Sequence, residues 1–170
     1  QSEVDKMALY CDATPQAPKT VRADDLEAIG AGTEEEGFAP LVNAVLSGDA
    51  ARVPGELRRM RELSLGAVGV LLAFERRAAQ LAQLAGRLGT RANIGEFVEG
   101  ERRSGRIFWR DAGDLKAQLT FWHGKRLDRL VRRLAATHRA LLANSAAAET
   151  LLAQELSEIA RKAINQPKSR

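Results

Sequence analysis

The chain has 170 residues, of which 45% are hydrophobic and 28% charged, a composition typical of globular domains, and its formal net charge is +4. Its 29 alanines and 22 leucines outnumber its 21 valines, isoleucines and threonines, and this ratio favours an all-α chain. No apolar run reaches the roughly 18 residues of a membrane span, and the single cysteine, Cys11, excludes an internal disulfide and a multi-cysteine metal site.

The N-terminal part is acidic and is predicted to form a small unit of its own. Residues 1–50 carry 3 basic and 10 acidic side chains, whereas residues 51–170 carry 23 basic and 12 acidic ones. Residues 2–10 predict the end of a helix, and a proline-containing link separates them from a short helix over 23–29. The glycines and glutamates that follow place a domain boundary near residue 35.

The first residues of the chain also bear on whether it is part of a longer protein and on its cellular location. It has no initiator methionine and begins inside a predicted helix, so we expect a fragment of a longer protein. It has no basic segment followed by an apolar stretch, so no signal peptide is predicted. Together with the single cysteine, this favours a reducing, cytoplasmic location.

Three helices with apolar stripes are predicted next, over 38–47, 49–62 and 64–88. Asp49 and Ser64 are the expected N-caps of the second and third helices. The third is the longest, and the seam along it steps by three and four residues through Leu71, Phe74, Ala78, Leu81, Ala85 and Leu88. Because other apolar residues flank this seam, we expect this helix to be central and to pack against several neighbours.

The second half of the chain predicts four more helices. A short one falls within 90–106, and longer ones cover 111–121, 124–143 and 147–163, before a tail at 166–170 that should fray. Six residues of the helix over 124–143 are expected to face inward: Leu127, Leu130, Val131, Leu134, Leu141 and Leu142. These elements together predict a helical bundle.

Aromatic residues mark two further points of the predicted core. Residues 107–109, Ile-Phe-Trp, form a dense apolar anchor. Trp109 and Trp122 are the side chains that could stack on nucleic-acid bases, but their apolar neighbours favour a place in the core for both.

No motif for catalysis, nucleotide binding or metal binding is found. Gly124 and Lys125 lack the upstream glycine of a phosphate-binding loop, since Leu119 stands at that position. The two histidines, His123 and His138, have no companions at metal-ligand spacing. We therefore expect no catalytic, cofactor-binding or metal-ligating residue, no cofactor, and neither binding nor hydrolysis of ATP.

The basic surface of the helix over 124–143 is the one positive signal for binding. Its cations are Lys125, Arg126, Arg129, Arg132 and Arg133. They predict a weak contact with DNA or a contact with a partner, and the plain alternative is a solvated helix face. Reversing Arg129, Arg132 and Arg133 to glutamate should change DNA retention at low salt more than thermal stability.

Several segments follow one another in a specific order. They are Ser2–Tyr10, Thr20–Ile29, Phe38–Asp49, Leu71–Arg76, Phe108–Arg110 and Gln118–Trp122, followed by Leu127, Leu130 and Leu134. In this order and spacing, nearly the whole chain resembles the C-terminal half of the delta subunit of the bacterial DNA polymerase III clamp loader. Two positions depart from that pattern, because Arg22 stands where a capping threonine is common and Leu142 where a lysine is usual.

The resemblance implies a domain layout and a set of partners. Residues 1–35 would be the end of a small helical AAA+ lid-like domain, and residues 36–170 a helical collar domain through which the subunit assembles. The implied partners are the other clamp-loader subunits, of the gamma/tau and delta-prime types. The sliding clamp would be touched only by an N-terminal domain that this chain lacks, DNA would be met indirectly or weakly, and no membrane is involved.

The resemblance also implies a function without catalysis. The chain would be a non-catalytic assembly part of the loader that places the sliding clamp during DNA replication. The parent holoenzyme would be the enzyme, a DNA-directed DNA polymerase and hence a nucleotidyltransferase. From the residues alone, the alternatives are a helical nucleic-acid-binding module that uses its basic helix face and a helical scaffold unrelated to replication.

Overall fold

A computed structural model describes residues 14, 17, 35–90 and 93–164, without the side chains of residues 35, 36 and 164. Contacts divide the chain into two units, Gln1–Ala39 and Pro40–Arg170. The predicted helical segments at 2–10 and 23–29 and the tail at 166–170 lie outside the described residues, so the lid-like domain at 1–35 stays a prediction. The packing of helices described below concerns the second unit.

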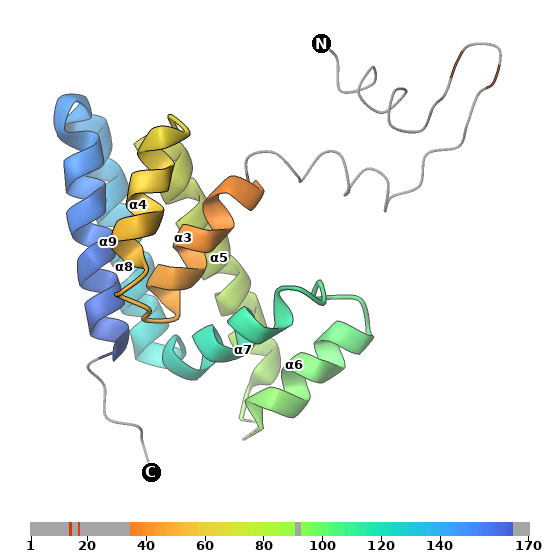
Figure 1. The fold of residues 1–170 in the computed structure, drawn as a ribbon. Helices are drawn as coiled ribbons and strands as arrows, with labels where there is room; N and C mark the ends of the chain where they lie inside the picture. The colour runs from red at the N-terminus through yellow and green to blue at the C-terminus, as the bar shows by residue number, and fades with distance from the viewer. Residues whose placement is uncertain (1–13, 15–16, 18–34, 91–92, 165–170) are drawn as a thin grey trace. The chain divides into compact units, whose positions relative to one another are not determined.

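The described part of the chain is built from α-helices (Figure 1). These are α3 (Glu35–Leu46), α4 (Val53–Glu62), α5 (Ala67–Leu88), α6 (Ile94–Arg103), α7 (Ala112–Phe121), α8 (Gly124–Ala143) and α9 (Ala148–Ile164), with a short 3-10 helix, η1 (Ser145–Ala147), before α9. The described residues contain no β-strand, only an isolated bridge between Thr14 and Ala17. The all-α prediction is confirmed for these residues, and a helical bundle is what they form.

The core of the second unit is organised around α5, as its seam predicts. This helix packs against α7, α8 and α9, and α6 packs against α7. Leu71, Phe74 and Leu81 of the seam are completely buried. The short connection through η1 makes α8 and α9 antiparallel neighbours, which is the usual result of a short loop between helices (Figure 1).

One predicted cap is wrong, and the turn between α4 and α5 explains why. Ser64 does not cap α5, which begins after Gly66 with no side-chain cap. Instead Ser64 has a φ of 53° and closes the end of α4. The Leu65 N–H donates to the Met60 carbonyl and the Ser64 N–H to the Arg61 carbonyl, which is the Schellman arrangement of a helix C-terminus.

The other predicted N-cap, Asp49, lies four residues before the start of α4. The Asp49 side chain accepts a hydrogen bond from the Arg52 N–H at 3.3 Å, but α4 itself begins at Val53. Pro54 accounts for the later start, because proline has no N–H to donate and fits best in the first turn of a helix.

Some predicted core residues are exposed instead. Leu127, Leu130, Leu134 and Leu141 of α8 are buried, whereas Val131 is 44% and Leu142 66% exposed. Each exposed residue directly follows a buried one and so points about 100° further around the helix, outside the buried stripe. The prediction that Val131 and Leu142 face inward is therefore wrong.

Candidate functional site

The predicted basic residues of α8 fall into two groups in the structure. Arg126, Arg129 and Arg133, spaced by three and four residues, share one face of the helix and line a cleft against α9. Lys125 and Arg132 do not line this cleft, and both are exposed on the adjacent part of the helix surface. The five predicted residues therefore do not all line the same cleft.

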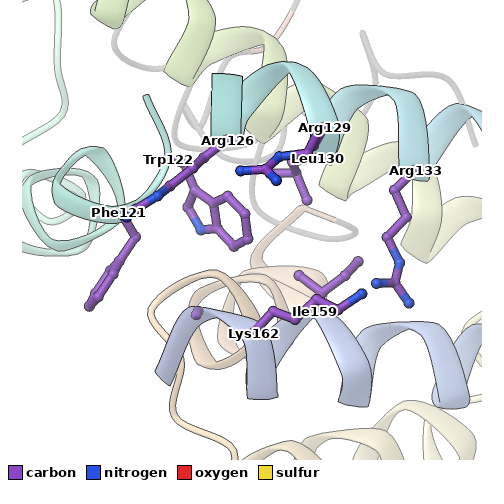
Figure 2. Close-up of a pocket in the computed structure, with 9 residues that line it drawn as sticks. Phe121, Trp122, Arg126, Arg129, Leu130, Arg133, Ile159 and Lys162 are labelled. Carbon is purple, nitrogen blue, oxygen red and sulfur yellow. The ribbon is translucent and has the colours of Figure 1, made fainter. Parts of the chain in front are cut away.

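The cleft is an apolar hollow with cations around it. It has a volume of about 360 Å³ and runs from the end of α7 along α8 to α9. Its apolar lining consists of Phe121, Trp122, Leu130, Ile159 and Ala163. Lys162 of α9 joins the three arginines as a fourth basic lining residue, and Figure 2 shows the Trp122 ring between Arg126 and Arg129 of α8 on one side and Ile159 and Lys162 of α9 on the other.

The turn between α7 and α8 positions the apolar wall of the cleft. Trp122 is the C-cap residue of α7, and its buried indole N–H donates to the Leu46 carbonyl of α3 at 2.7 Å, which holds the ring in place. Gly124 starts α8 with a φ of 50°, a conformation that glycine adopts without a steric cost. Arg126, two residues after the start of α8, lines the cleft together with Trp122.

Arg133 is held within the protein by two carboxylates of α9. Its Nε lies 2.6 Å from Glu155 Oε2, and one terminal nitrogen lies 2.6 Å from Glu158 Oε2. Partial burial opposes its charge, but hydrogen bonds to the two glutamates outweigh that effect and raise the pKa of Arg133 above its ordinary value. The hydrogen bond from Arg133, together with its charge, lowers the pKa of Glu158. Arg133 therefore links α8 to α9.

The other three cations of the cleft have no such partner. No carboxylate of the described residues lies within ion-pair distance of Arg126, Arg129 or Lys162. Among the described residues, Arg129 donates only to the Lys125 carbonyl, at 3.2 Å along its own helix. The charge of Lys162 helps to lower the pKa of Glu158, so Arg126 and Arg129 are the two cations whose charges are available to a ligand among the described residues.

A second exposed feature lies between α6 and α7. Phe108 is 55% and Trp109 62% exposed, with ring centroids 5.9 Å apart. The Arg110 guanidinium lies 5.9 Å from the Phe108 ring centroid and 5.1 Å from that of Trp109, within the range of cation–π attraction. Only Ile107 of the predicted anchor is buried, so the prediction that Trp109 belongs to the core is wrong, while that for Trp122 is confirmed.

Two groups of polar contacts among the described residues join helices. Asn43 donates to Asp114 at 2.6 Å and accepts from Gln118 at 3.0 Å, which ties α3 to α7. His138 lies 2.9 Å from Glu75 and joins α8 to α5. Among the described residues, no cluster of histidine, cysteine and carboxylate side chains has the arrangement of a metal site. No helix in the part that the structure describes has the length and apolar character needed to span a bilayer.

The cleft could be predicted only in part from the sequence. The spacing of Arg126, Arg129 and Arg133 indicates their common face, but Lys162 comes from another helix, 29 residues after Arg133. Comparison of the chain with protein-family profiles, with curated proteins and with solved structures finds no match.

Proposed function

We propose that this chain is a non-catalytic assembly module of a replicative clamp loader, equivalent to the C-terminal part of a delta subunit. The ordered segments along nearly the whole chain carry the proposal, because several of them belong to separate helices and are not required by a helical bundle as such. The chain would act in the cytoplasm, and catalysis would belong to other subunits of the polymerase holoenzyme.

Exposed apolar side chains support a role in assembly. Phe108 and Trp109 stand on the surface beside Arg110, and tryptophan and arginine are the residue types most enriched at the centres of protein interfaces. Leu63, Leu72, Val131 and Leu142 add exposed apolar surface on other helices and turns. A subunit in a ring needs contact surfaces toward two neighbours, and such dispersed apolar positions fit that need.

Gel filtration with purified gamma/tau-type and delta-prime-type subunits tests the proposal. We expect the chain to co-elute with them at about 10 µM, and Phe108→Ala/Trp109→Ala to weaken the complex about tenfold or more, as for interface hot spots. Lys125→Ala/Arg132→Ala is the matched control, because these side chains are exposed but polar. Failure of the unmodified chain to associate with either subunit would contradict the proposal.

A second candidate function is binding of nucleic acid through the basic face of α8. Lys125, Arg129 and Arg132 are exposed along this helix. Within the part of the chain that the structure describes, Arg132 donates only to the Asp128 carbonyl of its own helix. Binding through phosphates weakens with salt, with a logarithmic slope of about −0.9 per phosphate neutralised. A DNA affinity with this salt dependence, lost in Lys125→Ala/Arg132→Ala, would favour this candidate over the assembly module.

A further inference from the structure

The cleft between α8 and α9 has the chemistry of a ligand site, and this inference does not depend on the proposed function. Its volume of about 360 Å³ lies at the lower end of the range of small-molecule pockets. Such pockets combine an apolar lining with a few polar groups that orient the ligand. Here Trp122, Leu130 and Ile159 supply the lining, and Arg126 and Arg129 supply the polar groups.

We propose that this cleft binds a small organic phosphate, with its apolar body against Trp122 and its phosphate on Arg126 and Arg129. The Trp122 ring is fixed by its hydrogen bond to the Leu46 carbonyl, so the apolar wall is formed before any ligand arrives. The arginine fork matches the geometry of phosphate oxygens and donates charge-assisted hydrogen bonds to them.

The charge of the site selects the ligand class. Arg126, Arg129, Arg133 and Lys162 bring four positive charges, and Glu155 and Glu158 bring two negative ones, which leaves a net charge of +2. A phosphate monoester carries about −1.5 to −2 at pH 7 and so neutralises this excess, whereas a carboxylate neutralises only half of it. Because Arg133 is already paired, the phosphate binds at the α7 end of the cleft, beside Arg126 and Trp122.

The same features distinguish the cleft from a surface for DNA. A DNA phosphate backbone binds exposed cations along an open face, and Lys125 and Arg132 provide such cations. An apolar hollow adds nothing to the binding of a phosphate backbone. The pair Lys125 and Arg132 therefore provides a control with the same charge change on the same helix.

Isothermal titration calorimetry of the 170-residue chain with 1-naphthyl phosphate tests the proposal. We expect saturable binding of 1-naphthyl phosphate at one site. Inorganic phosphate and neutral 1-naphthol should bind more weakly, because the first lacks the apolar ring and the second lacks the phosphate. Arg126→Gln/Arg129→Gln should weaken binding about tenfold or more, since two charge-assisted hydrogen bonds are lost. Lys125→Gln/Arg132→Gln should weaken binding clearly less, because these side chains do not line the cleft and act on the phosphate only through screened charge.

Three results would overturn the proposal. The first is absence of binding of 1-naphthyl phosphate at millimolar concentration. The second is equal weakening by both double variants, which would indicate diffuse attraction by the whole helix. The third is equal affinity for inorganic phosphate, which would leave the apolar wall without a role. Circular dichroism of Arg126→Gln and Arg129→Gln as single variants checks that the fold is kept, which we expect because neither side chain makes an internal ion pair.

Discussion

Replacing Trp122 by phenylalanine removes one hydrogen-bond donor from the core and tests how α7 is joined to α3. The indole N–H donates to the Leu46 carbonyl over 2.7 Å, and the bond is buried. Without it, the carbonyl loses its side-chain partner in a buried place, which costs about 1–3 kcal/mol, and the smaller ring packs less well. For a loss of about 2 kcal/mol we expect the Tm to fall by about 4–8 °C, from the scaling for chains of this size.

The other tryptophan of the chain provides the control. Trp109 is 62% exposed and donates no hydrogen bond within the described residues, so Trp109→Phe should change the unfolding free energy by no more than about 0.5 kcal/mol. Each variant keeps one tryptophan, so fluorescence should show blue-shifted emission from Trp122 in Trp109→Phe and red-shifted emission from Trp109 in Trp122→Phe. Equal Tm shifts in thermal unfolding, or interchanged emission maxima, would refute the reasoning.

Three further predictions, which use five single variants, test the packing and the ion pairs. Leu141→Ala should cost about 2–5 kcal/mol in urea unfolding and Leu142→Ala less than about 0.5, because the two leucines are 1% and 66% exposed; similar costs would refute the assigned face of α8. Hydrogen bonds from Arg106 outweigh the effect of burial and, with the charge of Arg87, hold the pKa of Glu101 below its ordinary value of 4.5. The stabilisation by Glu101 is therefore complete above about pH 4.5 and is lost as the pH falls through the lower folded-state pKa, so urea unfolding of Glu101→Gln should show a smaller loss of stability on acidification than the unmodified chain. Arg133→Glu should lower the Tm, whereas Arg129→Glu should not, because Arg133 alone of the two is paired with Glu155 and Glu158; an unchanged Tm for Arg133→Glu would mean that these ion pairs do not form in solution.

The ion pairs of Arg133 affect the expected result of reversing Arg129, Arg132 and Arg133 to glutamate, which the sequence predicts to change DNA retention more than thermal stability. Sequence periodicity places Arg133 on the polar side of α8, and that part of the prediction is consistent with its partial exposure. Periodicity carries no information on which residues of another helix lie opposite. The ion pairs to α9 make Arg133 a structural residue, so the triple variant combines a loss of stability with any effect on DNA.

The helices of the second unit could be predicted because their signals are local. The seam through Leu71, Phe74 and Leu81 marks a buried helix face by spacing alone, and all three side chains are completely buried. The exposure of Phe108 and Trp109 could not be predicted in this way. The exposure of these two side chains depends on where the α6–α7 turn lies relative to its neighbours. A short apolar run has the same sequence pattern whether it packs in the core or contacts a partner protein.

The α4–α5 turn and the cleft show two further limits of the sequence. Ser64 has the residue type of a helix start, yet it closes the preceding helix through its backbone, because a serine can be accommodated at a positive φ when two backbone hydrogen bonds hold it. The cleft needs Trp122, Arg126 and Lys162 from three separate helical regions, and only the packing of α8 on α9 brings them together.

A reconstituted clamp-loading reaction tests the central proposal most directly. The 170-residue chain would be titrated into an assay with the sliding clamp, full-length delta and the other loader subunits. If the chain is an assembly module without the clamp-binding domain, it should displace full-length delta, reduce clamp loading in a concentration-dependent way, and show no binding to the isolated clamp. Unchanged loading at large excess of the chain, or direct binding of the chain to the clamp, would contradict the proposal.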